Sequence, residues 1–467
     1  MKHSRTDNDS AFIPKSSLQS LPPDILFKIL QGLPDHSSVF SLLQVLGTAD
    51  ARGVLESLWQ LGRTWKQSDL WPTLHLGLNC FDNDTISHLE VIAPLYTHVI
   101  LDDQYNIEWL QQHLHPTASL DWRCLPGQED QVQPLSLDEW YAKWATSLRT
   151  TRLTISERPT ADAMLVVAPS LVHLTRLTLR LATTPFPEGL FAWLPTSSVI
   201  DLDLTESFED VFVGHYTMSS LQHLRKWLET CPVRSLKLIG CEWSDSANAA
   251  RKICDAMFAC QTLEALTVAW YIFPNNFFKD KILPASMTHL ALNDCGLDSQ
   301  DLSSLTVALE QSNVTHFELQ GYSDENDEDD VGFNAFLRKV AETRITHLDL
   351  TRFGTTVLGL EDLALFDPKN HLETLILDGE LHLHGLEVKA IAEAMAIHPT
   401  LRYLSLADCQ DIEFKTALEL LPQAQLPAPR RTLNLGMTLK MSSDDVDRLH
   451  SIASERGIRL MLTQATT

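Results

Sequence analysis

The sequence predicts an α/β solenoid in which short parallel strands line one face and helices line the other. A strand pattern of the type L-x-x-L-x-L recurs along the chain, and a helical pattern of apolar residues follows many of the copies. The chain has 467 residues, and repeated units can extend to this length without a single large core. One such unit cannot cover its own apolar face, so we expect neighbouring units to stack.

The repeat can be followed by the middle apolar residue of each strand. From residue 153 onward, successive markers stand 24 to 34 residues apart. These markers are Leu153, Leu177, Leu202, Leu236, Leu266, Leu290, Phe317, Leu348, Leu375, Leu404 and Leu433. Weaker copies centre on Leu74 and Val99, and LDWRC near Leu120 is a further candidate strand. Residues 73–467 therefore hold roughly 13 repeats, with a less regular register at 100–150.

The clearest strands, such as MTHLALNDC (287–295) and LRYLSLADC (401–409), resemble leucine-rich repeats. The resemblance implies a horseshoe with its parallel sheet on the concave face. Leu302, Leu305 and Leu309 recur at helical spacing, in a long helix similar to those of ribonuclease-inhibitor-like proteins. Near the end of the chain, Ser442 and Asp445 predict a capping box, Gly457 predicts the end of that helix, and the strand IRLML closes the solenoid.

Three cysteines follow repeat strands at the position where leucine-rich repeats place a small inward side chain. They are Cys241, Cys295 and Cys409. Because a free thiol packs as a small apolar group, we expect all three to be buried.

An amino-terminal segment, residues 18–72, differs in composition from every repeat. Pro22 and Pro23 suit the start of a helix, and the apolar residues that follow form one helical stripe, with Phe27 away from it. The segment resembles an F-box, on its leucine-proline start, its helical residues and its tryptophan-rich end. The matching residues are Leu21, Pro22, Asp24, Ile25, Leu26, Ile29, Leu30, Leu33, Asp35, Phe40, Leu42, Leu43, Trp65, Leu70 and Trp71.

The F-box resemblance implies a small all-α bundle that binds the adaptor subunit of a cullin-type ubiquitin ligase. The adaptor-binding residues it implies are Leu21, Pro22, Ile25, Leu26, Phe27 and Ile29. The stretch GTADARGVLESLWQLGR departs from the compact spacing of the motif. The alternative is therefore a helical cap over the first repeat, which a solenoid needs. Residues 1–17 are expected to be a flexible terminus.

Polar residues that alternate with the strand leucines are the candidates for contact with a partner. The candidate partner-binding residues of the concave face are Arg152, Arg176, Arg180, His289, His316, Glu318, His347, Asp349 and Tyr403. The three arginines could form a fork for a carboxylate or phosphate, or a solvated edge. The three histidines share one repeat position and predict either a pH-sensitive contact or a plain surface ladder. No cysteine pair accompanies them, so no zinc site is indicated.

The charge balance constrains the class of partner. Lys and Arg number 36 against 61 Asp and Glu, a formal charge of -25, so the field repels nucleic acid and anionic lipid. No stretch reaches the roughly 20 apolar residues of a membrane helix, and no signal peptide is indicated. The dispersed cysteines indicate reduced thiols and a cytoplasmic or nuclear location. The acidic run 323–330 predicts a solvated loop and lacks the pattern of a calcium loop.

No motif for a nucleophile, a phosphate cradle or a metal occurs, so we expect neither an enzyme nor a cofactor. The resemblances together imply a substrate receptor of a cullin-type (SCF-like) ubiquitin ligase, whose partners are the ligase adaptor and a target protein. The alternative is a non-ligase scaffold or regulator of the ribonuclease-inhibitor-like or GTPase-activating type.

Overall fold

The computed structural model describes residues 23–462 apart from short segments. The segments left out are 78–79, 81, 83–84, 103–105, 128–134, 182–185, 207–213, 244–246, 271–272, 274–276, 322–329, 352–369, 380–390, 393–394, 396–397, 408, 410–413, 422–430 and 437–441. The predicted acidic loop at 323–330 therefore lies almost wholly outside the described residues. The chain divides into an N-terminal unit (Met1–Ile155 and Asp162–Leu174) and a C-terminal unit (Ser156–Ala161 and Thr175–Thr467).

The N-terminal unit begins with a bundle of short helices. They are α1 (Pro23–Gln31), α2 (His36–Leu46), α3 (Ala49–Arg52), η2 (Gly53–Leu55), α4 (Glu56–Leu61) and α5 (Gln67–Leu70). Asp35 caps α2 by accepting the Ser38 amide at 2.8 Å. The indole nitrogen of Trp71 donates to the Leu33 carbonyl at 3.1 Å, so the end of the segment is tied to the turn between α1 and α2.

Among the residues described in this unit, four parallel strands follow. They are β1 (Leu74–Leu76), β2 (His98–Leu101), β3 (Ser119–Trp122) and β4 (Thr150–Ile155), with α6 (Ile86–Ile92), η4 (Ala93–Leu95), α7 (Ile107–His113) and α8 (Leu137–Ser147) between them. Leu120 pairs with Val99, which confirms LDWRC as a strand. The register shifts between Leu120 and Asp121, so that Trp122 pairs with Leu153. The shift lies within the stretch of less regular register predicted at 100–150.

In the described part of the C-terminal unit, eleven parallel strands form one sheet. They are β5 (Arg176–Leu181), β6 (Asp201–Glu206), β8 (Ser235–Ile239), β10 (Ala265–Ala269), β11 (His289–Asn293), β12 (His316–Gln320), β13 (His347–Asp349), β14 (Thr374–Ile376), β15 (Tyr403–Ser405), β16 (Arg431–Asn434) and β17 (Ile458–Met461). Two further strands, β7 (Gly214–Tyr216) and β9 (Cys241–Trp243), pair separately.

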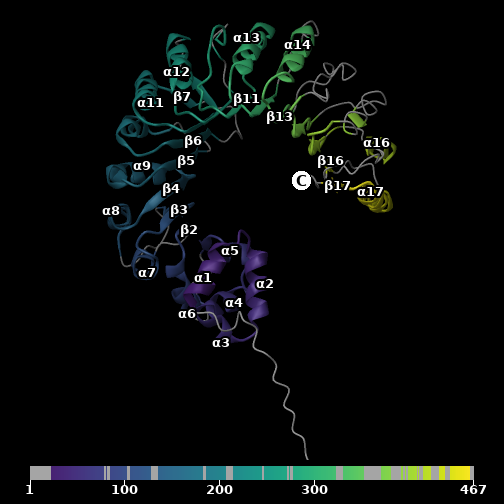
Figure 1. Cartoon of the computed structure of the whole chain (residues 1–467). Helices are drawn as coiled ribbons and strands as arrows, with labels where there is room; N and C mark the ends of the chain where they lie inside the picture. Colours follow the sequence, from purple (N-terminus) through teal and green to yellow (C-terminus); the bar gives the residue numbers. More distant parts are fainter. Residues whose placement is uncertain are drawn as a thin grey trace, which may run out of the picture. The chain divides into compact units, whose positions relative to one another are not determined.

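The remaining helices follow the strands along the chain. They are α9 (Arg158–Val167), η5 (Ala168–Ser170), α10 (Glu188–Trp193), η6 (Leu194–Thr196), α11 (Met218–Thr230), α12 (Ala247–Ala259), α13 (Ser299–Glu310), α14 (Asp330–Val340), α16 (Phe414–Leu420) and α17 (Ser443–Glu455). Figure 1 shows α11, α12, α13 and α14 on one side of the strands, with the opposite face of the sheet uncovered by helices there.

Strand register in the C-terminal unit follows the predicted markers. Each marker from Leu177 to Leu433 pairs with the next one, and Leu433 pairs with Leu460 of the closing strand. None of these markers up to Leu433 is more than 2% exposed. The repeat is therefore confirmed as a parallel strand-and-helix arrangement, as in a leucine-rich-repeat solenoid.

Other sequence features also occupy the expected places. Leu302, Leu305 and Leu309 are buried in α13, and Ser442 and Asp445 form the capping box of α17. The thiols of Cys295 and Cys409 are buried and donate to the carbonyls of Val268 and Leu377. Cys241 lies in β9, and its side chain is outside the described part.

None of the helices in the described ranges combines the length and hydropathy that crossing a bilayer requires.

Gly62 provides a test of packing in the N-terminal bundle. A Cβ at this position would lie 1.9 Å from Cε1 of Phe40, a ring that is only 4% exposed. Gly62→Ala should therefore destabilise the chain by about 1–3 kcal/mol, the usual cost of overpacking. Denaturant unfolding followed by tryptophan fluorescence would measure the change.

The matched control is Gly77→Ala. A Cβ there would lie 3.7 Å from the nearest atom, the Asp102 carbonyl oxygen, which is an ordinary contact. A loss of stability as large in the control as in Gly62→Ala would contradict the described packing.

Candidate partner-binding surface

The uncovered face of the C-terminal sheet carries the candidate residues in rows. Alternate residues of a strand point to opposite faces, so each leucine marker points inward and its two neighbours point outward. Because the strands pair in register, outward residues of neighbouring strands stand beside one another. His289, His316 and His347 occupy one row, and Glu318 and Asp349 occupy the next.

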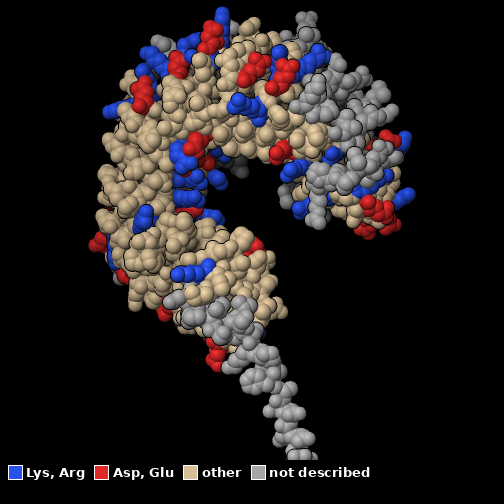
Figure 2. Space-filling model, in the orientation of Figure 1, with Lys and Arg blue, Asp and Glu red and all other residues tan. Residues whose placement is uncertain are grey.

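Basic residues at the start of this sheet are paired with acidic ones. Arg176 donates through Nε and Nη2 to one oxygen of Asp201 at 3.2 and 3.0 Å, and Nζ of Lys237 lies 4.0 Å from Asp203. Figure 2 shows blue and red side chains side by side at this part of the sheet. The charge of Arg176 is thus neutralised by Asp201. Arg176 is therefore not available for the predicted arginine fork that would bind a carboxylate or phosphate.

The two other predicted arginines are exposed. Arg180 lies on β5 near Arg176, whereas Arg152 lies on β4 in the N-terminal unit. On β5, Arg176 is therefore ion-paired with Asp201, and Arg180 is exposed. The three predicted arginines do not form one site within one unit.

The three histidines of neighbouring strands form a stack, which we call the histidine ladder (His289, His316 and His347). Ring centroids of His289 and His316 are 4.1 Å apart with planes inclined by 19°. Those of His316 and His347 are 4.0 Å apart and inclined by 15°. The sequence predicted their shared position, and the register makes them stack.

A threonine precedes each histidine of the ladder and fixes the orientation of its ring. The Oγ1 atoms of Thr288, Thr315 and Thr346 lie 2.7, 3.0 and 2.8 Å from Nδ1 of the following histidine. Each hydroxyl also lies 3.3 to 3.4 Å from a backbone carbonyl oxygen of the preceding strand's segment. The rings are therefore held at one edge by the protein.

The central imidazole resists protonation. Burial, which is the largest cause, and the neighbouring His347 and His289 together lower the pKa of His316 from 6.5 to about 4. A charged ring would lose solvation and face a histidine on either side. At neutral pH the middle of the ladder is accordingly uncharged.

Beside the ladder lie two carboxylates, Glu318 and Asp349, which we call the acid pair. Asp349 accepts hydrogen bonds from the Gln320 amide at 3.0 Å and from the Thr351 amide and hydroxyl at 2.9 and 2.6 Å. Burial raises the pKa of Glu318, and the charge of Asp349 raises it further, whereas a hydrogen bond from Asn293 lowers it. The two carboxylates therefore repel one another, and a cation between them would relieve this repulsion.

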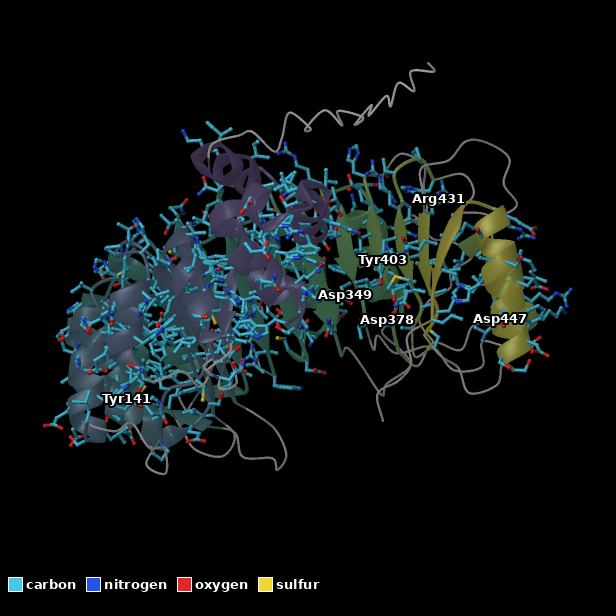
Figure 3. All side chains as sticks on the ribbon, turned by 90° about the horizontal axis from the view of Figure 1, so that it is seen from below. Tyr141, Asp349, Asp378, Tyr403, Arg431 and Asp447 are labelled. Atoms are coloured by element: carbon cyan, nitrogen blue, oxygen red, sulfur yellow. The ribbon has the colours of Figure 1, made fainter. Side chains whose placement is uncertain are left out.

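Tyr403 continues the outer row of the ladder two strands beyond His347, after Thr374. Its side chain is half-buried, and Nδ2 of Asn434 lies 3.5 Å from its hydroxyl. Figure 3 shows Asp349, Asp378 and Tyr403 on this part of the sheet. The structure thus brings five of the predicted residues to one region, namely His289, His316, Glu318, His347 and Asp349, with Tyr403 at its margin.

The sequence interpretation missed Trp270, which follows β10 and is 46% exposed. Its φ is 53°, in the left-handed region that disfavours large side chains. Gly240, Gly321 and Gly379 occupy the same position after β8, β12 and β14, also with positive φ. At each of these positions the backbone amide donates to the next strand's segment, for example Trp270 to Asn293 at 2.9 Å.

Repetition of this turn was the signal that sequence reasoning could have used. A tryptophan at a position where three other repeats have glycine is conformationally unfavourable, and such outliers often mark functional sites. Asn293 and Gln320, which hydrogen-bond the acid pair, were also missed, although they occupy equivalent positions on adjacent strands.

The candidate adaptor-binding residues are described only in part. Ile25 is 41% exposed on α1, Ile29 is half-buried and Leu30 is fully buried. Ile25 therefore does not belong to the buried stripe predicted for this helix, although its exposure leaves it accessible to a partner. Leu21 and Pro22 lie outside the described residues, as do the side chains of Leu26 and Phe27.

In the described part of the chain, no three His, Cys, Asp or Glu side chains are arranged to hold a metal ion.

Comparison with known proteins adds little to the structural description. No protein-family model matches the chain, and no curated protein matches it. Among solved structures, the leucine-rich repeat-containing protein LegL7 from Legionella pneumophila is similar, with 16% identity over 77% of this chain and 88% of that chain. The TM-score is 0.28, too low to establish a shared fold, so the repeat architecture rests on the strand pairing.

The ladder predicts a loss of stability in acid. Because His316 binds its proton less readily when folded, the folded state holds fewer protons than the unfolded chain between pH 6.5 and about 4. The contribution of the neutral His316 ring to the free energy of unfolding is therefore complete above pH 6.5 and falls as the pH drops towards 4. Replacing His316 by Gln should reduce the fall in Tm between neutral pH and about pH 5 by about 2–4 °C.

His98→Gln is the matched control for this measurement. His98 is an exposed histidine on β2 that contacts the preceding Thr97 in the same way, with Oγ1 3.0 Å from Nδ1. The control should keep the pH dependence of the wild-type chain. If His316→Gln also keeps it, the ladder is not the source of the acid sensitivity.

Proposed function

We propose that the protein is a non-catalytic binding protein that acts as a substrate receptor of a cullin-type ubiquitin ligase. In this role the amino-terminal helices recruit the adaptor, and the open face of the sheet holds a target protein. The observation that carries the binding role is the uncovered sheet face, on which polar and charged residues stand in register. Parallel sheets usually have both faces covered, so an uncovered one is available for a partner.

The acid pair and the ladder support recognition of a polar protein surface. Their side chains come from three consecutive strands, β11, β12 and β13, so the backbone fixes their spacing. Sites built on regular elements hold their geometry better than sites built on loops. A rigid polar surface of this kind suits selection among protein partners.

The ligase part of the proposal is supported by the amino-terminal bundle. An apolar residue, Ile25, is 41% exposed on α1, and Trp71 at the end of the segment is bonded back to Leu33. The matched residues thus span one packed helical bundle. An exposed apolar side chain on such a bundle is suited to contact with a second protein.

A second candidate, a scaffold or regulator without a ligase, is favoured by how this bundle packs. Helix α4 packs on α6, and α5 packs on β1. The Ser57 hydroxyl lies 3.2 Å from Nδ1 of His88 on α6, and the Tyr96 hydroxyl donates to the Leu70 carbonyl at 2.5 Å. The helices therefore cover the open edge of the first repeat, as a plain cap would.

Adaptor binding separates the two candidates. The ligase receptor should co-purify with the adaptor subunit when the full chain is expressed in its native cell, and Ile25→Asp should abolish the complex. Burying an unpaired carboxylate in an apolar contact typically weakens binding by about 2–4 kcal/mol, or about 30-fold or more. Quantitative co-purification of the wild-type chain and of the Ile25→Asp variant with the adaptor would measure this loss.

Val166→Asp is the matched control, because Val166 is an exposed apolar residue on α9 (82%), outside the bundle. It should leave the complex intact. Absence of the adaptor from the wild-type complex, under conditions where a known F-box protein retains it, would favour the scaffold.

A further inference from the structure

The histidine ladder and the acid pair present mainly hydrogen-bond acceptors to solvent. The Thr–His contacts of 2.7 to 3.0 Å are shorter than the contacts of 3.3 to 3.4 Å from the same hydroxyls to backbone carbonyls. A threonine hydroxyl has one proton. Both contacts can be hydrogen bonds only if Nδ1 donates to Oγ1 and Oγ1 donates to the carbonyl.

That arrangement fixes the tautomer of the neutral rings. With the proton on Nδ1, each Nε2 carries a lone pair and accepts hydrogen bonds. Among the described residues, no group hydrogen-bonds Nε2 in any of the three rings. In their neutral form, the rings of the ladder thus offer a row of Nε2 hydrogen-bond acceptors.

The acid pair adds negative charge directly beside this row. No basic side chain of the described residues forms a salt bridge with Glu318 or Asp349. Lys237, which lowers the pKa of Glu318, lies three strands away in β8 and is already 4.0 Å from Asp203. The carboxylates of the acid pair therefore lack a neutralising partner of their own.

We propose that the ladder and the acid pair together form a recognition site for an arginine side chain of the partner protein. A guanidinium group carries five N–H donors and a fixed charge, and it bonds carboxylates in a forked geometry. Glu318 and Asp349 stand on adjacent strands, roughly 4.8 Å apart, a spacing that one guanidinium can bridge. Its remaining donors match the Nε2 acceptors of the ladder.

The proposal rests on the protein-binding role proposed above but does not depend on a ligase adaptor. The acid pair would repel an acidic partner segment, and a neutral segment would leave its negative charge uncompensated. An arginine side chain both neutralises this charge and donates hydrogen bonds to the acceptors. The formal charge of -25 also favours approach of a basic segment from solution.

Peptide binding to the full chain tests the proposal. The probe is a fluorescein-labelled peptide of sequence GSGRGRGSG, compared with the same peptide carrying citrulline, which is neutral and similar in shape, at both arginine positions. Fluorescence anisotropy at neutral pH and low salt would measure both affinities. The arginine peptide should bind about tenfold more tightly than the citrulline peptide.

Two double variants with the same change in charge locate the site. Glu318→Gln/Asp349→Asn should weaken binding of the arginine peptide about tenfold. The control, Asp447→Asn/Glu455→Gln, removes two exposed carboxylates from α17 and should change affinity by less than about twofold. Thermal unfolding of each variant would verify that it is folded.

Three results would overturn the proposal: equal affinity for the citrulline peptide, equal weakening by the two double variants, or no measurable binding by the wild-type chain. Each of them leaves adaptor binding through α1 unaffected. Conversely, loss of adaptor binding alone would refute the ligase role and leave arginine recognition standing.

Discussion

The arrangement of the C-terminal unit depends on one constraint, the pairing of each repeat's inward leucine with that of the next strand. The markers are almost fully buried and meet in register from Leu177 to Leu433. A slip by one residue would turn every inward side chain outward, so burial of this leucine row specifies the register strongly. The outward rows, including the ladder and the acid pair, follow from the same pairing because they lie between the leucines.

Much of this architecture could be predicted from the sequence because the repeat is redundant. A recurring apolar pattern identifies strand positions many times over, and the same pattern identifies the outward residues between them. The sequence therefore predicts that His289, His316 and His347 share one row. The strand at Leu120 was harder to place, because a register shift separates it from β4.

The sequence could not predict the contacts that give the candidate surface its chemistry. Pairing of Arg176 with Asp201 depends on side-chain conformations that the repeat pattern does not constrain. The low pKa of His316 arises from burial and ring stacking, which are visible only in three dimensions. Trp270 breaks a local backbone preference: the glycines at the equivalent position of other repeats are visible in the sequence, but the positive φ of Trp270 is visible only in the structure.

Arginine recognition by the ladder requires that His316 is neutral and that the rings offer their Nε2 atoms as hydrogen-bond acceptors. The most direct test is the set of imidazole ¹⁵N chemical shifts of the full chain with histidine labelled, followed from neutral pH to about pH 5. His316 should remain neutral at about pH 5.5, with its proton on Nδ1 and Nε2 unprotonated. Titration of His316 near pH 6.5, or a proton on its Nε2 at neutral pH, would contradict this expectation.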